Sequence, residues 1–270
     1  MKRSTRLAAA FFGILLMASH AGAAIIYLQN FSETSGMTAL TNLNWEPYYG
    51  NSTNTVATLA MPGNNTAVAN AMISGGPSAP TPGANVNATQ AISSTVDGFV
   101  PLLSAYGNDQ FFVYTNEYTI NTSVNTPTSF SWYAASASAG DSQRLVVQID
   151  GNWYASTSSI TPFSPVGNGN SFGGDAVKYT TPFTTSASAW ETVNFSAGSL
   201  LTLGSVLTSP LPGDNITGFG IYADIADNST GVERTYFDSF EVDATPEPGA
   251  GLMILGSVAT LLLRRRRAVR

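Results

Sequence analysis

The central part of the chain, residues 24–243, alternates apolar and polar positions in short runs that are separated by turn residues. The runs are rich in Val, Ile, Phe, Tyr and Thr, which favour a pleated sheet, and they show no convincing helical period. The predicted strands are residues 25–31, 56–61, 111–120, 128–137, 143–149, 153–156, 190–195, 216–222 and 234–242. This spacing predicts an all-β protein with antiparallel strands.

The sharpest pattern is RLVVQIDGNWYAS, residues 144–156. Leu145, Val147 and Ile149 share one face of a strand. Asp150-Gly151 or Gly151-Asn152 then offers residues that tolerate the positive φ angles of a tight turn. The segment therefore predicts a β-hairpin, with Trp153 and Tyr154 on opposite faces of its second strand.

Two further strands have a predicted core face. In residues 129–134 this is the face of Trp132, and the opposite face carries serines and Tyr133. In RTYFDSFEVD, residues 234–243, strict alternation predicts that four residues share one face of the strand: Tyr236, Asp238, Phe240 and Val242.

The opening IIYLQNFSE, the central SWYAASASAGDSQRLVVQIDGNWYAS and the closing RTYFDSFEVD together resemble jelly-roll β-sandwiches of the concanavalin-like and carbohydrate-binding-module type. The resemblance is one of pattern and extends loosely over about 210 residues. It implies a single antiparallel jelly-roll β-sandwich over residues 24–243. It fixes no site and suits a purely structural sandwich equally well.

The first 23 residues have the three parts of a secretory signal peptide. Lys2, Arg3 and Arg6 come first, an apolar stretch of residues 7–18 follows, and Ala21-Gly22-Ala23 ends the segment. We expect a signal helix, export, and removal by signal peptidase after Ala23. A permanent anchor is the alternative, but the apolar stretch is short for a membrane span.

The last residues, 244–270, combine three features in order. Pro246-Glu247-Pro248 stops a helix from extending backwards. Residues 249–263 are uncharged and mostly apolar, which predicts a short transmembrane helix of about 22 Å against a hydrocarbon core of roughly 30 Å. An arginine cluster follows: Arg264, Arg265, Arg266 and Arg267.

Pro-Glu-Pro, a short apolar helix and terminal arginines closely resemble the PEP-CTERM sorting signal of Gram-negative bacteria. The resemblance covers about twenty-five residues. It implies recognition by an integral-membrane exosortase, removal of the tail, and release or attachment at the outer surface or in the extracellular matrix. The inner membrane would hold the protein only transiently. In that family such signals often occur in organisms that produce extracellular polysaccharide, the material of biofilms. The alternative is an ordinary tail anchor with an incidental Pro-Glu-Pro.

Charge and composition exclude several classes of partner and of catalytic or metal site. The formal net charge is −6, but between Arg6 and Arg264 three basic residues face seventeen acidic ones, which leaves −14. Such a body repels phosphate backbones, so we expect no nucleic-acid partner. Cysteine is absent, and the one histidine, His20, lies in the signal. These absences exclude a thiol nucleophile, a Ser-His-Asp triad and a thiolate or imidazole zinc site.

Two aromatic clusters are candidate sugar platforms, because pyranose rings stack on aromatic faces and their hydroxyls bond to amides and carboxylates. NWEPYYGN holds the first, in a segment predicted to be turn-like around Pro47. The second flanks the predicted hairpin. The candidate residues for binding extracellular polysaccharide are Trp45, Tyr48, Tyr49, Trp153, Tyr154, Asp150 and Asn152. Core or sheet packing is the alternative for each cluster.

Asp224, Asp227 and Asn228 are hard oxygen donors of the kind that Ca²⁺ prefers, although their spacing matches no EF-hand loop, and a solvated acidic loop is the alternative. No cofactor besides Ca²⁺ is expected. No catalytic residue is identified, since the chain lacks the Glu-x-Asp-x-x-Glu pattern that resembles the signature of concanavalin-like glucanases.

We therefore rank three functions. The first is a structural or interaction protein of the cell surface or extracellular matrix. The second is a carbohydrate-binding module, and the third is a glycan-active hydrolase.

Overall fold

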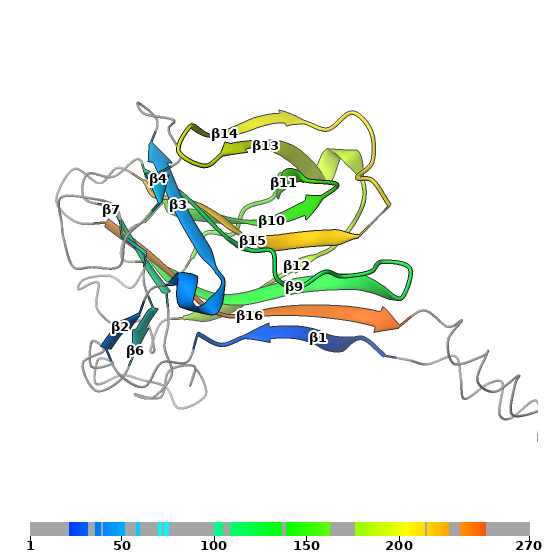
Figure 1. Cartoon of the computed structure of the whole chain (residues 1–270), viewed down its shortest axis with the longest axis horizontal. Coiled ribbons are helices and arrows are strands. Elements are labelled where there is room, and N and C mark those ends of the chain that lie inside the picture. The colour runs from blue at the N-terminus through cyan, green and yellow to red at the C-terminus, as the bar shows by residue number, and fades with distance from the viewer. Residues whose placement is uncertain are drawn as a thin grey trace, which may run out of the picture.

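The computed structural model describes residues 22–31, 36–38, 40–51, 58–59, 70–71, 73–75, 100–104, 109–136, 139–162, 176–213, 215–226 and 233–246. The described residues form β-strands and two short 3-10 helices, η1 (Leu40–Leu43) and η3 (Ala187–Ala189), and no α-helix. The strands build two large antiparallel sheets (Figure 1). The predicted all-β class with antiparallel strands is confirmed.

The six-stranded sheet forms one layer. Its order is β12 (Val177–Pro182), β9 (Asn125–Ser136), β16 (Glu233–Pro246), β7 (Val100–Ser104) and β5 (Asn70–Ala71), with β1 (Ala24–Gln29) paired to the C-terminal half of β16. The long strands β9 and β16 run side by side through its centre (Figure 1).

The eight-stranded sheet forms the other layer. Its order is β14 (Leu200–Val206), β13 (Trp190–Ser196), β11 (Asn152–Ser156), β10 (Ser142–Ile149), β15 (Ile216–Asp224), β8 (Asp109–Thr115), β3 (Glu46–Asn51) and β4 (Thr58–Leu59). A separate small ribbon pairs β2 (Gly36–Thr38) with β6 (Ile73–Gly75).

The main core lies between the two sheets, where side chains of alternate residues meet. Phe130 on β9 packs against Phe219 on β15, and Phe219 stacks on Phe240 of β16 with ring centroids 5.7 Å apart. Trp45, Trp132 and Phe240 are fully or almost fully buried in the same cluster. Burial of this apolar area stabilises the sandwich without any disulfide.

Gln143 joins the two layers inside this core. Its Oε1 accepts a hydrogen bond of 2.7 Å from the indole N–H of Trp132 on β9. Its Nε2 donates to Thr235 Oγ1 and to the carbonyl of Tyr236, both on β16. Gln143 is completely buried, so these bonds offset the cost of removing its amide from water.

The predicted hairpin is confirmed. β10 and β11 pair with Ile149 opposite Asn152, and Asp150 and Gly151 form the turn. Both turn residues have positive φ, 52° and 76°, as a two-residue turn between twisted strands requires. Trp153 and Tyr154 point to opposite faces of the sheet, since they belong to different apolar clusters.

The predicted face of residues 234–243 is wrong. Phe237, Phe240 and Val242 all lie in the main core, whereas Tyr236 packs on the opposite face against Ala135 and Ala176. A register shift between Asp238 and Glu241 reverses the alternation, and Ser239 has a φ of 50° there. An inserted β-bulge residue exchanges the two faces of every position beyond it, so strict alternation failed.

The first and last strands of the described chain, β1 and β16, are paired side by side. Ala24, at the start of β1, is opposite Ala244 of β16, and Pro246 is opposite Asn125 of β9. The start of β1 and the end of β16 therefore lie at the same end of the six-stranded sheet (Figure 1). β16 thus continues three residues past the predicted domain boundary at residue 243.

The predicted signal segment up to residue 21 and the tail from Glu247 onward lie outside the described residues. Within the part of the chain that the structure describes, there is no helix with the length and apolar character of a membrane span.

Candidate ligand-binding face

The eight-stranded sheet curls back on itself. β14 is at one edge and β3 is next to the other, yet the two strands contact each other. Phe195 on β13 and Tyr48 on β3 also meet, with ring centroids 4.9 Å apart. The face of this sheet that is turned away from the six-stranded sheet is therefore the inside of a partial barrel, and we call it the curled face.

Apolar side chains line the curled face. This is unusual, because the outer face of an antiparallel sheet in a sandwich is normally polar and solvated. A second apolar cluster, separate from the main core, covers it: Tyr48, Phe112, Tyr114, Val146, Trp153, Ala155, Val193, Phe195, Leu201, Leu203 and Tyr222. Strands β3, β8, β10, β11, β13, β14 and β15 all contribute to this cluster.

Two glycines of β15 make room for the rings. A Cβ atom on Gly218 would lie 2.8 Å from Cη2 of Trp153, so the indole rests directly over this backbone. A Cβ atom on Gly220 would lie 2.0 Å from the carbonyl oxygen of Val113 and 2.7 Å from Cα of Tyr114. Glycine at these positions allows the close approach of β8 and the curl of the sheet.

The rings of the curled face form a continuous set of contacts. Phe112 meets Trp153 edge to face at 4.9 Å and Phe195 at 4.7 Å. Tyr114 lies 4.7 Å from Trp153 and is almost parallel to Tyr48, at 9° and 6.3 Å. These geometries are the favourable ones for aromatic pairs, each of which contributes about 0.5–1.5 kcal/mol beyond burial.

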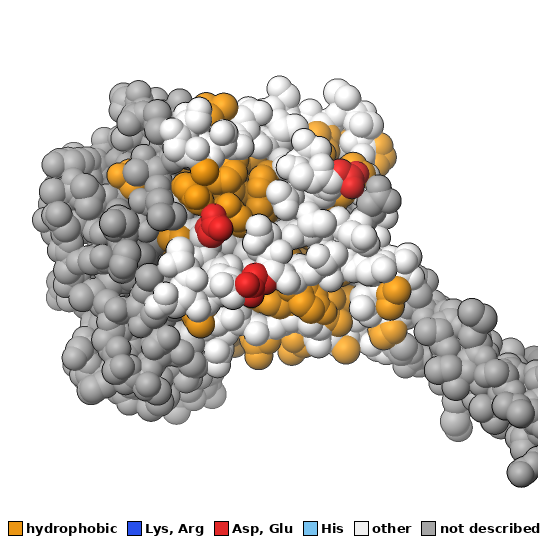
Figure 2. Space-filling view, viewed as in Figure 1, with side chains coloured by type: hydrophobic (Ala, Val, Ile, Leu, Met, Phe, Trp, Pro, Cys, Tyr) orange, Lys and Arg blue, Asp and Glu red, His pale blue; other side chains and the backbone are white. Residues whose placement is uncertain are grey.

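Most of this cluster is buried, and only its edge, which we call the opening of the curled face, reaches the surface. Phe112 is fully buried, and Trp153 and Tyr114 are each 7% exposed. Tyr48, Phe195 and Leu203 are only partly buried, so they form the accessible surface of the cluster. Figure 2 shows apolar side chains gathered between β14 and β15, with an acidic side chain beside them.

Glu46 provides a carboxylate next to these rings. It precedes Tyr48 by two residues on β3 and therefore shares its face. The hydroxyl of Tyr114 donates a 2.9 Å hydrogen bond to its Oε2, and the negative charge of Glu46 also acts on the Tyr48 hydroxyl. Burial and the nearby Glu46 charge raise the pKa of Tyr48 and of Tyr114, so both hydroxyls stay protonated as donors.

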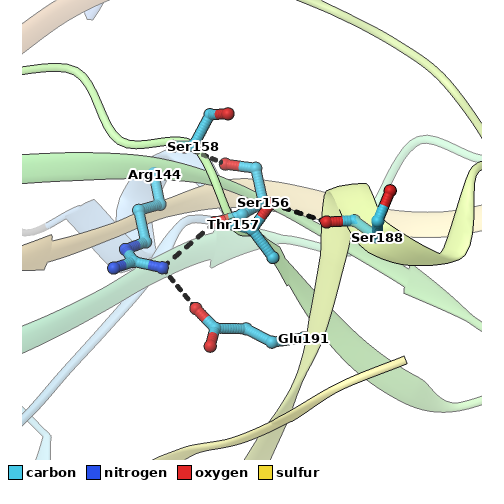
Figure 3. A network of polar contacts seen from close by, with 6 residues as sticks. All are labelled: Arg144, Ser156, Thr157, Ser158, Ser188 and Glu191. Atoms are coloured by element: carbon cyan, nitrogen blue, oxygen red, sulfur yellow. Dashed lines mark hydrogen bonds and ion pairs between the residues drawn. The ribbon is translucent and has the colours of Figure 1, made fainter. Parts of the chain in front are cut away.

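A second polar group lies on the same face, at Arg144 of β10. Its guanidinium pairs with Glu191 of β13, and Nη1 also donates 3.3 Å to the carbonyl of Ser156 (Figure 3). Asp224 ends β15 with an exposed side chain, and partial desolvation by the neighbouring protein raises its pKa, which the Arg144 charge partly opposes. Because Arg144 attracts both carboxylates, the positive charge on this face is already balanced.

The end of β11 beside this ion pair is fixed by backbone contacts. Thr157 Oγ1 donates to the carbonyl of Ser188 at 3.0 Å, and its N–H donates to that of Ala189 at 2.9 Å. Ser156 Oγ donates 2.7 Å to the carbonyl of Ser158 (Figure 3). These bonds hold η3 and the start of β13 against β11, and so position Glu191.

The structure divides the candidate sugar residues of the sequence. Tyr48 and Trp153 lie together on the curled face, as described above. Trp45 is fully buried, and Tyr154 and Tyr49 contribute to the main core from the opposite face. These three residues are therefore placed away from the curled face.

Asp150 and Asn152, the polar candidates of the hairpin, are exposed at its turn. The Asn152 side chain donates 3.2 Å to the Asp150 carbonyl, which stabilises the turn locally.

Sequence reasoning overlooked most of the curled face. Residues 46–51 were predicted to be turn-like because of Pro47, but they form strand β3, which pairs with β8 and β4. Phe112 and Tyr114 lie in the predicted strand 111–120, but they are not among the candidate sugar residues of the sequence. FFVYT is apolar at successive positions, and that pattern is typical of a strand with both faces buried. It could have revealed the second apolar face.

The predicted calcium residues are only partly described. Asp224 ends β15, and Asp227 and Asn228 lie outside the described residues. Within the described ranges, no three Asp, Glu, His or Cys side chains are grouped as metal ligands. A calcium site at Asp224, Asp227 and Asn228 stays a prediction.

Among known proteins, two solved structures resemble this chain, and they assign it to no family. No family model and no curated protein matches the chain. A family 11 carbohydrate-binding module from Clostridium thermocellum, in complex with a β-1,3-1,4-mixed-linked tetrasaccharide, has 13% identity and a TM-score of 0.40 over 84% of this chain and 98% of its own. The family 11 module of the cellulosomal cellulase Lic26A-Cel5E from the same organism has 13% identity and a TM-score of 0.39 over 85% and 97%.

Both structures belong to the class of domain that the strand pattern resembles. Their TM-scores and identities are too low to place this chain in that family. The jelly-roll order of the strands and the C-terminal sorting signal stay predictions.

Proposed function

We propose that the protein is an exported bacterial surface protein whose sandwich binds extracellular polysaccharide at the opening of the curled face. One observation carries this proposal. The outer face of the eight-stranded sheet bears an aromatic cluster, and its accessible part consists of Tyr48, Phe195 and Leu203 beside the carboxylate of Glu46.

The chemistry of this opening suits a sugar ring. The C–H face of a pyranose packs on an aromatic or aliphatic surface, and its hydroxyls bond to charged and polar groups at the edge of that surface. Tyr48 and Phe195 offer the apolar surface, and Glu46 offers acceptor oxygens. Strands hold all three residues, so binding orders little of the protein and costs little conformational entropy.

A structural role without a ligand is the second candidate function. It is favoured by the burial of the same rings, because Phe112, Trp153 and Tyr114 fill the curled face as a second core would. In that case the aromatic cluster stabilises the curl of the sheet, and its opening is a small exposed edge of that core.

The proposal includes export and processing at the C-terminal Pro-Glu-Pro segment. Ala24, which follows the expected signal cleavage site, and Pro246, which begins the motif, lie at the same end of the six-stranded sheet. Attachment at that end leaves the curled face, on the other sheet, free to meet a polymer. The exosortase-type enzyme and signal peptidase are the proposed processing partners.

Affinity for soluble polysaccharides tests the binding proposal. Tyr48→Ala removes an accessible ring and should weaken binding by about 1–3 kcal/mol, the usual cost of losing a central aromatic contact. Tyr133→Ala is the matched control, since Tyr133 is a partly buried tyrosine on β9 of the other sheet. In affinity electrophoresis against neutral, acidic and amino-sugar polymers, a polymer that retards the wild type should retard Tyr133→Ala equally and Tyr48→Ala less.

If no polymer retards the folded wild-type protein, the binding proposal fails and the structural role is the function that remains. Equal retardation of Tyr48→Ala and wild type would move the binding site away from the curled face.

A further inference from the structure

Glu46 is held in an unusual way for a half-buried carboxylate. The hydroxyl of Tyr114 donates a hydrogen bond to it, and the ring of Tyr48, two residues along the same strand, lies nearly parallel to that of Tyr114. Among the described residues the ion pairs are Arg144 with Glu191 and Lys178 with Glu241, so no described basic side chain pairs with Glu46.

A carboxylate beside aromatic rings attracts one kind of group above others. A protonated amine gains the Coulomb attraction of Glu46 and a cation–π contact with the face of a tyrosine ring. Tyr114 already donates to Glu46, which orients the carboxylate and lowers the reorganisation that binding needs. We propose that Glu46, Tyr48 and Tyr114 form a site for an ammonium group at the opening of the curled face.

This site deepens the proposed function and rests on it, since it names the class of polysaccharide. The ligand is a glycan with protonated amino sugars, such as glucosamine units without acetyl groups. The other charges of the molecule agree with this choice. Glu46, Glu191 and Asp224 outnumber Arg144 on the curled face, and the chain between Arg6 and Arg264 carries −14. Such a face repels uronate polymers and attracts cationic ones.

Isothermal titration of the full-length protein with three matched chains tests the site. The chains are hexamers of β-1,4-linked glucosamine, of N-acetylglucosamine and of glucose. We expect the glucosamine hexamer to bind about tenfold more tightly than the other two, because its ammonium groups alone can make both the cation–π contact and the ion pair. Glu46→Gln keeps the shape of the side chain and should abolish this preference.

The control variant is Glu117→Gln, which removes an exposed carboxylate in the segment after β8 and should keep the preference. Choline chloride and free lysine, added as competitors, separate an amino-sugar site from a general ammonium site. Displacement of the hexamer only by glucosamine oligomers supports the inference as stated. Equal displacement by choline overturns the sugar class but keeps the ammonium site.

Two results overturn the site itself. Equal binding of all three hexamers, with no effect of Glu46→Gln, leaves a glycan-binding face without an ammonium site. Binding of no hexamer, while thermal melting shows a folded protein, rejects the proposed function together with the inference.

Discussion

The curl of the eight-stranded sheet depends on Gly220, and Gly220→Ala is the substitution that tests this directly. The new Cβ atom would lie 2.0 Å from the carbonyl oxygen of Val113 and 2.7 Å from Cα of Tyr114. Both are backbone atoms of the neighbouring strand β8, so no side-chain rotation relieves the overlap. β8 and β15 must separate at the centre of the sheet.

The magnitude follows from two costs. Overpacking costs about 1–3 kcal/mol, and moving the Val113 carbonyl weakens about two ladder hydrogen bonds at about 1 kcal/mol each. The expected loss is therefore about 3–5 kcal/mol. For a domain of about 220 residues this lowers Tm by roughly 6–20 °C.

Two other glycines are internal references. A Cβ atom on Gly218 would lie 2.8 Å from Cη2 of the Trp153 side chain, which can shift, and 3.1 Å from the Thr115 carbonyl oxygen, so Gly218→Ala should cost less than Gly220→Ala, about 1–3 kcal/mol. Gly213 has nothing within 4 Å, and Gly213→Ala should stay within about 0.5 kcal/mol of wild type. Urea unfolding followed by tryptophan fluorescence measures all three. A Gly220→Ala protein as stable as Gly213→Ala would refute the close approach of β8 and β15.

Three further predictions concern Gln143 in the core, the Asp224 carboxyl beside Arg144, and the C-terminal tail. Gln143→Leu should destabilise the protein by about 2–4 kcal/mol in urea, because the Trp132 N–H and the Tyr236 carbonyl each lose a buried partner; an unchanged midpoint would contradict that network. The pKa of Asp224 is raised above its ordinary value of 3.8, so its charged form costs stability as the pH rises through the raised pKa. Asp224 is exposed, so the effect is small: Asp224→Asn should raise Tm slightly at about pH 7 and have little effect at about pH 3, whereas a lower Tm at neutral pH would mean that attraction to Arg144 dominates. Replacing Pro246-Glu247-Pro248 by three alanines should leave full-length protein in the membrane, and replacing Arg264–Arg267 by serines should release unprocessed protein. Mass spectrometry of the surface-exposed form checks both, and an intact Arg270 on mature surface protein would make the tail an ordinary anchor.

The sequence predicts the fold class and the central hairpin because both depend on local patterns. Alternation in residues 143–149 and the turn residues Asp150 and Gly151 specify β10 and β11 without help from distant segments. Trp132 follows the same rule and lies in the main core as predicted. Where alternation is regular and one face of a strand is buried, the period of two determines which side chains face the core.

Local patterns fail where a backbone irregularity or a distant partner decides the outcome. The bulge at Ser239 reverses which residues of β16 face the core, and no residue type near it predicts the inserted position. Pro47 suggested a turn, although it lies within strand β3. Proline is tolerated in a strand where its missing N–H is not needed for pairing.

The candidate site was only partly predictable for a related reason. Tyr48 and Trp153 were named from the sequence as parts of separate clusters, but their common face arises from the curl that brings β13 and β14 to β3. Phe195 and Leu203 join them only through this long-range contact. No spacing along the chain encodes it, because the curl depends on Gly218 and Gly220 of β15, which is paired between β10 and β8.

A crystal structure of the protein soaked with the polysaccharide fragment that binds most tightly tests the central claim most directly. The account predicts a sugar ring against Tyr48, Phe195 and Leu203, with its polar groups within hydrogen-bond distance of Glu46. A sugar bound on the six-stranded sheet, or a curled face that stays empty at saturating fragment, would contradict it.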